Sequence, residues 1–237
     1  MSRLYQALKH AAERGRQMRS EPDLGAEDIV REPEQGAYER IAQEVLNGSA
    51  SQELQVVLMS SAVEGEGVST VARELARLLS DHAPVLLLDG NPHAASQHEA
   101  FGLSRGPGLT DVLAERLDVH DAIHFGVWKQ LSFLAAGSDN GALLEATRLE
   151  SLKDRIIELN AGFRWIIVDS PPLTSSSEAA PLLKLSDAAI MVVRAERTRS
   201  HVVERAKRDL QASGTRILGA VLNRRKYHIP EFIYRLL

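Results

Sequence analysis

The chain reads, from residue 54 to residue 79, Leu54-Gln55-Val56-Val57-Leu58-Met59-Ser60-Ser61-Ala62-Val63-Glu64-Gly65-Glu66-Gly67-Val68-Ser69-Thr70-Val71-Ala72-Arg73-Glu74-Leu75-Ala76-Arg77-Leu78-Leu79. Residues 54–59 form an apolar run that predicts a strand, and residues 71–79 have the apolar spacing of a helix. Between them, residues 60–70 form a glycine-bearing turn that leads into the helix. The backbone N–H groups of such a turn, together with the positive end of the helix dipole, bind phosphate oxygens. The stretch therefore predicts a phosphate-binding loop.

One position in this loop departs from the usual pattern. A working loop carries a lysine on the transferred phosphate, directly before the hydroxyl residue that holds magnesium. Here that position is Val68. Losing a charge-assisted hydrogen bond weakens binding by roughly 10- to 100-fold, and losing a preorganised donor lowers a rate by about 10²–10³. We therefore expect weak or absent ATP turnover, with these nucleotide-binding residues: Gly65, Glu66, Gly67, Val68, Ser69 and Thr70.

Length and composition limit the remaining classes of protein. The 237 residues, 44% of them hydrophobic, suffice for one well-buried domain with appendages. The chain has no cysteine, which excludes disulfides, thiolate zinc sites and cysteine nucleophiles. The formal net charge is −4, without the excess of positive charge that is typical of proteins that bind nucleic acid, so no nucleic-acid partner is expected. No apolar run approaches the roughly 20 residues of a membrane-spanning helix and no signal-peptide core is visible, so we expect a cytoplasmic protein.

The chain divides by composition into four segments. Residues 1–19 predict a basic amphipathic helix with apolar residues on one face. Residues 20–36 are rich in Glu, Asp and Pro and predict a flexible acidic linker. Residues 37–226 predict a single P-loop NTPase-like α/β domain, and residues 227–237 form a C-terminal tail.

Short apolar runs alternate with helical patterns through the predicted domain. Strands are expected at residues 54–59, 85–88, 131–134, 165–168, 188–193 and 217–222. Helices are expected at residues 37–46, 71–79, 149–159 and 200–212. Runs without polar alternation are typical of strands buried on both faces, and strand–helix alternation is typical of a parallel sheet. The predicted fold class is therefore α/β, with a doubly wound, mostly parallel sheet of the P-loop NTPase type.

Two aspartates stand at strand ends of this sheet. Asp89 follows the apolar run at residues 85–88, and Asp169 follows the run at residues 165–168. Ligands of such sheets bind at the carboxyl ends of the strands, and an aspartate there, beside a phosphate-binding loop, commonly holds magnesium. Each aspartate alone could instead cap the following loop, but two in frame with the loop favour a metal site. We predict Asp89 and Asp169 as catalytic residues, and Ser69, Asp89 and Asp169 as magnesium ligands within about 8 Å of one another.

Further segments extend the pattern beyond the loop. They are Phe101-Gly102-Leu103-Ser104-Arg105-Gly106-Pro107-Gly108-Leu109-Thr110-Asp111-Val112-Leu113, Leu134-Ala135-Ala136-Gly137, Asp169-Ser170-Pro171-Pro172, Met191-Val192-Val193-Arg194-Ala195-Glu196-Arg197-Thr198 and Leu218-Gly219-Ala220-Val221-Leu222-Asn223. Together with the loop, they resemble the bacterial tyrosine kinases (BY-kinases) of capsular and exopolysaccharide assembly, relatives of the MinD/ParA-type ATPases. The resemblance spans about residues 50–226.

The resemblance implies cofactors, further site residues and partners. It implies ATP and Mg²⁺ as cofactors and adds Asn223 to the nucleotide-binding residues. The family phosphorylates a tyrosine cluster at its own C-terminus, where this chain offers only Tyr227 and Tyr234 as phosphoacceptors. The family works beside a membrane-bound chain-length regulator, a polysaccharide co-polymerase. We therefore expect such a partner and a location peripheral to the inner membrane, and a homo-oligomer is left open.

Departures from the family decide between three functions. Besides Val68, the second aspartate of the family's Asp-x-Asp strand end is Asn91. These changes favour a degenerate, pseudokinase-like protein that regulates polysaccharide polymerisation or export by binding. The first alternative is an active tyrosine autokinase with a relocated cation, although Arg73 is expected to point away and Arg194 and Arg197 stand at another strand end. The second alternative is a positioning ATPase of the MinD/ParA type.

Overall fold

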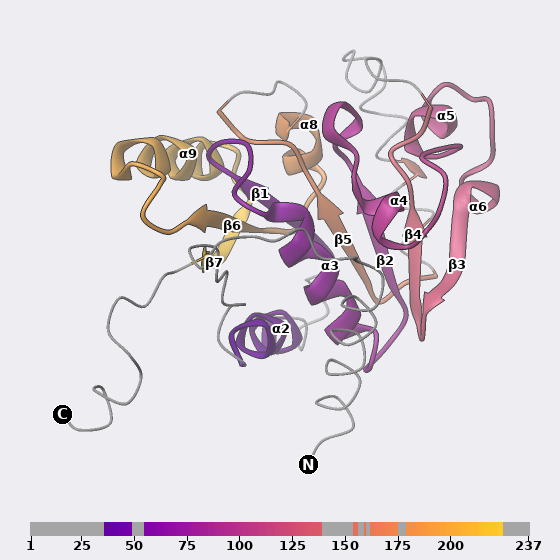
Figure 1. The fold of residues 1–237 in the computed structure, drawn as a ribbon, viewed down its shortest axis with the longest axis horizontal. Helices are drawn as coiled ribbons and strands as arrows, with labels where there is room; N and C mark the ends of the chain where they lie inside the picture. Colours follow the sequence, from indigo (N-terminus) through magenta and orange to yellow (C-terminus); the bar gives the residue numbers. More distant parts are fainter. Residues whose placement is uncertain are drawn as a thin grey trace, which may run out of the picture. The chain divides into compact units, whose positions relative to one another are not determined.

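A seven-stranded sheet forms the centre of the part of the chain that the structure describes (Figure 1). The structure is a computed structural model, and it describes residues 36–48, 55–138, 154–155, 159, 162–174 and 179–224. The strands are β1 (Val56–Ser61), β2 (Val85–Asp89), β3 (Ile123–Trp128), β4 (Leu131–Leu134), β5 (Trp165–Asp169), β6 (Ala188–Arg194) and β7 (Arg216–Asn223). Their order across the sheet is β3-β4-β2-β5-β1-β6-β7. All neighbouring strands are parallel except the edge pair β3–β4, which confirms the predicted fold class.

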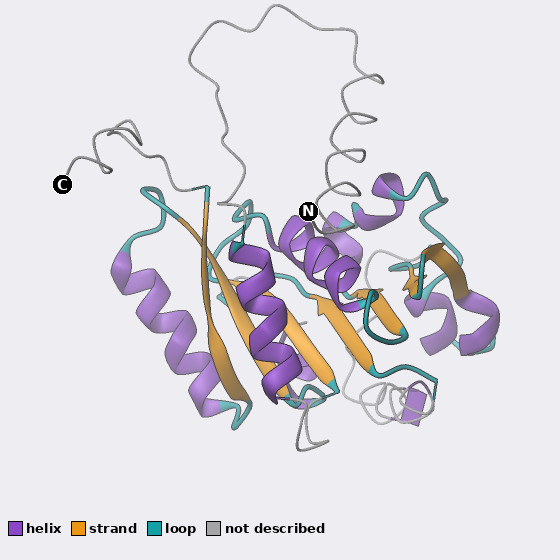
Figure 2. Ribbon diagram, turned by 90° about the horizontal axis from the view of Figure 1, so that it is seen from below, coloured by secondary structure: helices purple, strands orange, loops and turns teal. Residues whose placement is uncertain are grey.

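Helices cover both faces of this sheet (Figure 2). Those in the described ranges are α2 (Ala37–Gly48), α3 (Val68–Leu79), the 3-10 turn η2 (Pro92–Ala94), α4 (Gln97–Ala100), α5 (Leu109–Leu113), α6 (Val119–Ala122), α8 (Ala179–Lys184) and α9 (Ser200–Ala212). The α3 helix packs on β1, β2 and β5, and α2 packs on α3. The other face, which carries Val56 and Leu58, shares a core with α5, α6, α8 and α9.

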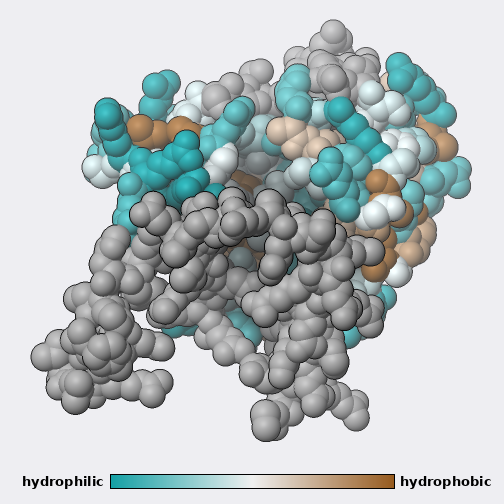
Figure 3. Space-filling view, in the orientation of Figure 1, coloured by the Kyte–Doolittle hydropathy of each residue, from teal (hydrophilic) through white to brown (hydrophobic). Residues whose placement is uncertain are grey.

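The central strands owe their burial to this double cover. Every residue of β1, β2 and β5 is buried, as expected for apolar runs without polar alternation. The α9 helix has the opposite character, because only Ala206 and Leu210 of it are buried. Hydrophilic side chains accordingly gather over α9 on the face seen in Figure 3.

The strand predictions are confirmed to within two residues at each end. The structure differs from the sequence-based predictions in two informative places, one helix and one strand. Helix α3 begins at Val68 instead of residue 71, because Gly67 adopts φ 91°, a left-handed conformation that turns the loop directly into the helix. The edge strand β3 was not predicted. It is half-exposed, its register shifts between His124 and Trp128, and Gly126 has φ 66°, so the sequence shows neither an apolar run nor a clean alternation.

Several predicted segments lie outside the described residues. These are residues 1–19, residues 227–237, all of residues 20–36 except Gly36, and most of the helix expected at residues 149–159. Within the ranges that are described, no helix is both long and apolar enough to cross a bilayer.

Candidate functional site

The carboxyl ends of β1, β2 and β5 meet the start of α3. Asp89 and Asp169 are directly opposite each other in the register of β2 and β5, and neighbouring strands lie about 4.8 Å apart. Gln97 Nε2 joins the Ser69 carbonyl oxygen, on the first turn of α3, to Asp169 Oδ2, and hydrogen bonding by the Ser69 side chain lowers the pKa of Asp169. The structure therefore brings together Ser69, Asp89 and Asp169, the three residues predicted as magnesium ligands, while their role as ligands stays a prediction.

Both carboxylates are buried and incompletely satisfied. Burial, and then the neighbouring Asp169 carboxylate, raise the pKa of Asp89 to about 7, against the opposing effects of backbone hydrogen bonds and Arg105. Burial raises the pKa of Asp169 to about 6, although hydrogen bonds from Ser69 and Gln97 and the charge of Arg73 lower it. Among the described residues, Asp89 Oδ2 and Asp169 Oδ1 are buried oxygens without a hydrogen-bond donor. Two adjacent, unsatisfied carboxylate oxygens fit a hard divalent cation.

The protein supplies only part of a metal coordination shell. The described residues contain no group of three or more His, Cys, Asp or Glu side chains that could hold a metal ion. Mg²⁺ is commonly held by one or two carboxylates, with waters and substrate phosphates completing its octahedron. Asp89, Asp169 and the Ser69 hydroxyl fit that pattern, and the adjoining loop provides the place for phosphates.

The loop keeps the backbone shape that phosphate binding requires. Gly65 and Gly67 have φ values of 78° and 91°, and Gly67 is the N-cap of α3, so no capping side chain covers the first N–H groups of the helix. Thr70 is exposed on this first turn. The backbone and dipole therefore fit a phosphate, whereas Val68, buried at the first position of α3, contributes no charge.

The side chain of Glu66 is committed to the protein itself. Its Oε2 accepts hydrogen bonds from the N–H groups of Ala62 (2.9 Å) and Val63 (3.2 Å). Its Oε1 accepts from the N–H of Arg194 at 3.1 Å and from the Thr198 hydroxyl. Glu66 thus fastens the loop to the end of β6 and to the segment that follows it. Its carboxylate is therefore not available to a nucleotide.

Asn223 at the end of β7 also holds the loop. Its Nδ2 donates to the Glu66 carbonyl oxygen at 2.8 Å. A Cβ added at Gly67 would lie 2.3 Å from this nitrogen, so only glycine fits there. Asn223 therefore lies against the predicted nucleotide loop, and its contact with a nucleotide stays a prediction. The predicted phosphoacceptors Tyr227 and Tyr234 lie outside the described residues.

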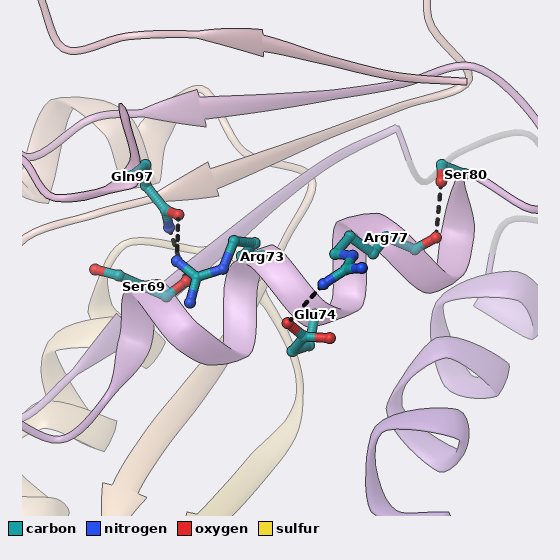
Figure 4. A network of polar contacts seen from close by, with 6 residues as sticks. All are labelled: Ser69, Arg73, Glu74, Arg77, Ser80 and Gln97. Atoms are coloured by element: carbon teal, nitrogen blue, oxygen red, sulfur yellow. Dashed lines mark hydrogen bonds and ion pairs between the residues drawn. The ribbon is translucent and has the colours of Figure 1, made fainter. Parts of the chain in front are cut away.

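Sequence reasoning missed Gln97 and misplaced Arg73 (Figure 4). Gln97, the first residue of α4, contacts Asp169, and Arg73 Nη1 donates to Gln97 Oε1 at 3.1 Å. The prediction that Arg73 points away is wrong. Arg73 follows Ser69 by four residues on α3, which places both side chains on the same helix face. Arg194 is the last residue of β6 and Arg197 follows the strand, so both stand at that strand end as predicted, with Arg197 exposed.

The raised pKa values predict how stability depends on pH without metal. Between about pH 4 and pH 7 the folded protein holds protons on Asp89 and Asp169 that the unfolded chain has released, so the free energy of unfolding falls as pH rises. We expect a higher melting temperature at pH 5 than at pH 7.5 in EDTA. Asp111, whose pKa is lowered by hydrogen bonds from Ser138 and Gly108, opposes this trend only at more acidic pH.

A variant isolates the contribution of the pair. Asp89→Asn removes one of the two carboxylates, so the fall in melting temperature from pH 5 to pH 7.5 should be smaller than in the wild type. The melting temperatures are measured by differential scanning calorimetry. An equal fall in the variant and the wild type would contradict the assignment of this pH dependence to Asp89 and Asp169.

Comparisons with known proteins agree with this arrangement. The family model described as cellulose biosynthesis protein BcsQ matches residues 54–218. Tyrosine-protein kinase YwqD of Bacillus subtilis is 28% identical over 190 residues, which cover 80% of each chain. Tyrosine-protein kinase CpsD of Streptococcus agalactiae serotype III is 29% identical over 182 residues, 74% of this chain and 76% of CpsD.

Solved structures show the same relationship. The kinase domain of VpsO aligns with a TM-score of 0.69 and 28% identity, covering 81% of this chain and 95% of that one. MinD of Pyrococcus horikoshii, solved with Mg-ADP, aligns with a TM-score of 0.62 and 22% identity, covering 77% and 76%, and shows the fold alone. These matches confirm the resemblance to bacterial tyrosine kinases and the P-loop NTPase type of the fold.

Proposed function

The chain belongs to the P-loop family of cellulose biosynthesis protein BcsQ, and on this premise we propose that it is a degenerate BY-kinase-like regulator of exopolysaccharide or capsule assembly. It binds Mg-ATP weakly, turns it over slowly or not at all, and acts by binding a partner. The observation that carries the proposal is Val68 at the first position of α3, where an active loop has lysine.

The retained parts of the site explain why some nucleotide binding is expected. The loop backbone, the start of α3 and the carboxylates of Asp89 and Asp169 remain in place. Nucleotide binding therefore loses the contribution of one cation, a factor of roughly 10–100. Phosphoryl transfer loses more, because charge that develops on the phosphates has no lysine to neutralise it.

A turnover assay tests the proposal. The purified chain is incubated with Mg-ATP, and released phosphate and tyrosine phosphorylation are measured, with Val68→Lys alongside. The expected result is wild-type turnover no more than slightly above that of a variant lacking both carboxylates, Asp89→Asn/Asp169→Asn. Wild-type turnover well above that background would refute the regulator.

One observation favours a second candidate, an active autokinase that phosphorylates Tyr227 or Tyr234. The guanidinium of Arg73 lies one side chain from Asp169, linked through Gln97, so a cation remains close to the site. Mass spectrometry after incubation with Mg-ATP separates the two candidates, because only the autokinase adds phosphate to a tail tyrosine.

We propose that the partner is a membrane-bound protein. The names of the relatives are those of tyrosine kinases, and the proposed regulator acts beside a membrane-bound chain-length regulator, a polysaccharide co-polymerase. In this proposal residues 1–35, with their basic amphipathic segment and acidic linker, recruit the chain to that complex at the inner membrane.

Deletion of residues 1–35 should separate recruitment from folding. The linker composition is too polar to add to the core, so the melting temperature should change by less than about 2 °C, under ~1 kcal/mol for a domain of this size. Co-fractionation with the membrane complex should decrease. A large drop in melting temperature, or unchanged membrane association, would contradict this division of roles.

A further inference from the structure

Gln97 bridges the elements that build the site, and Figure 4 shows it beside Ser69 and Arg73 of α3. Its Nε2 donates to Asp169 Oδ2 at 2.8 Å and to the Ser69 carbonyl oxygen at 2.7 Å. A hydrogen bond from its backbone N–H lowers the pKa of Asp89. One fully buried residue of α4 therefore contacts Asp169 and the first turn of α3 and lies beside Asp89.

The orientation of the Gln97 amide follows from its partners. A carboxylate oxygen and a carbonyl oxygen both require the NH₂ group, which uses its two hydrogens on them. The amide oxygen accepts from Arg73 Nη1 at 3.1 Å. Reversing the amide would place its oxygen against two acceptors and its NH₂ against a cation, so Arg73 and Asp169 together fix a single orientation.

These contacts leave a specific pair of oxygens open. The bonds to Gln97 and Asn91 occupy Asp169 Oδ2 and Asp89 Oδ1, whereas Asp169 Oδ1 and Asp89 Oδ2 have no donor among the described residues. We infer that Gln97, held in turn by Arg73, is a positioning residue that turns the free oxygens of Asp89 and Asp169 toward a divalent cation. The inference deepens the proposed function, since it rests on the same site.

The expected size of the effect follows from known metal sites. Hydrogen-bond partners of ligating carboxylates orient the ligands, and losing one typically weakens metal affinity by about 10- to 100-fold. Gln97→Met removes the amide without changing the charge. We therefore expect Gln97→Met to bind Mn²⁺ about tenfold more weakly than the wild type.

Arg73→Met provides the sharper test, because a pure charge effect of Arg73 and a positioning role of Arg73 predict opposite changes in Mn²⁺ affinity. Removing a nearby positive charge by itself strengthens the binding of a cation. Removing the group that holds Gln97 weakens it. Arg77→Met is the matched control: Arg77 lies one turn further along α3, 3.5 Å from Glu74 and 4.3 Å from the Trp128 ring centre, and contacts neither carboxylate.

The experiment titrates the full chain with Mn²⁺ alone, without nucleotide, and follows free Mn²⁺ by electron paramagnetic resonance. Arg73→Met should weaken binding several-fold, Arg77→Met should stay within about twofold of the wild type, and Arg73→Met/Gln97→Met should bind no more weakly than Gln97→Met, since Arg73 acts through Gln97. If Gln97→Met unfolds, Arg73→Met at its half-exposed helix position carries the test.

Each outcome has a clear meaning. Arg73→Met binding as tightly as Arg77→Met, or Gln97→Met binding within twofold of the wild type, would overturn the inference and leave the proposed function standing. No Mn²⁺ binding by the wild type would contradict the metal site itself. Tight Mg-ATP binding by the wild type would refute the proposed function but not this inference, which is read from differences between variants.

Discussion

Val68→Lys is expected to tighten Mg-ATP binding by about 10- to 100-fold. The substitution restores a cation at the first position of α3, beside a loop whose glycine geometry and helix start are already suited to phosphate. Isothermal titration calorimetry of both proteins measures the change. Because the rest of the site stays in place, the gain reports the lysine contact alone.

Val68→Met is the matched control for this gain. It lengthens the side chain at the same position without adding charge, so its affinity should stay close to that of the wild type. An equal gain from Val68→Met would mean that side-chain size, and not charge, limits nucleotide binding.

Asp169→Asn should have the largest effect on the metal site. It removes a carboxylate that is buried beside Asp89 and has one unpaired oxygen. Mn²⁺ affinity should fall by more than the roughly 10- to 100-fold that the loss of a ligand's hydrogen-bond partner costs. Without metal, the melting temperature at pH 7.5 should rise instead, because a buried and uncompensated charge has been removed.

The opposite signs of these two changes distinguish a metal ligand from a structural carboxylate. Asp81→Asn serves as the control, since Asp81 lies just beyond the other end of α3, with a partly exposed side chain in an ion pair with Lys129. It should leave Mn²⁺ affinity unchanged. If Asp169→Asn lowered the melting temperature in EDTA and left Mn²⁺ affinity intact, Asp169 would be a folding residue and not a ligand.

The sequence predicted those features of the fold and the site that depend on a local pattern of residues. Strands buried on both faces are mostly apolar, so β1, β2 and β5 were visible as apolar runs, which end in Ser60-Ser61, Asp89 and Asp169. Asp89 and Asp169 end two such runs, and adjacent parallel strands bring their ends to one edge of the sheet. Their place at this edge is therefore predictable from the sequence, whereas their direct opposition depends on β2 and β5 being neighbours, which the structure shows.

The sequence was uninformative where a contact depends on tertiary placement. Gln97 belongs to a four-residue helix without periodicity, and only the folded chain places it against Asp169 and Arg73. Glu66 illustrates the same limit. Its place in the loop predicted nucleotide binding, but its carboxylate bonds Arg194 and Thr198, which lie more than a hundred residues away in the chain.

Calorimetric titration of the wild-type chain with Mg-ATP at pH 7.5 measures how far Val68 weakens nucleotide binding, with Val68→Lys in parallel to show that the site can respond. Because Val68 supplies no charge to the phosphates, we predict a wild-type Kd weaker than about 100 μM, or no binding, and a Val68→Lys Kd that is lower by about 10- to 100-fold. Low-micromolar affinity of the wild type for Mg-ATP would contradict the proposed loss of the phosphate-binding cation.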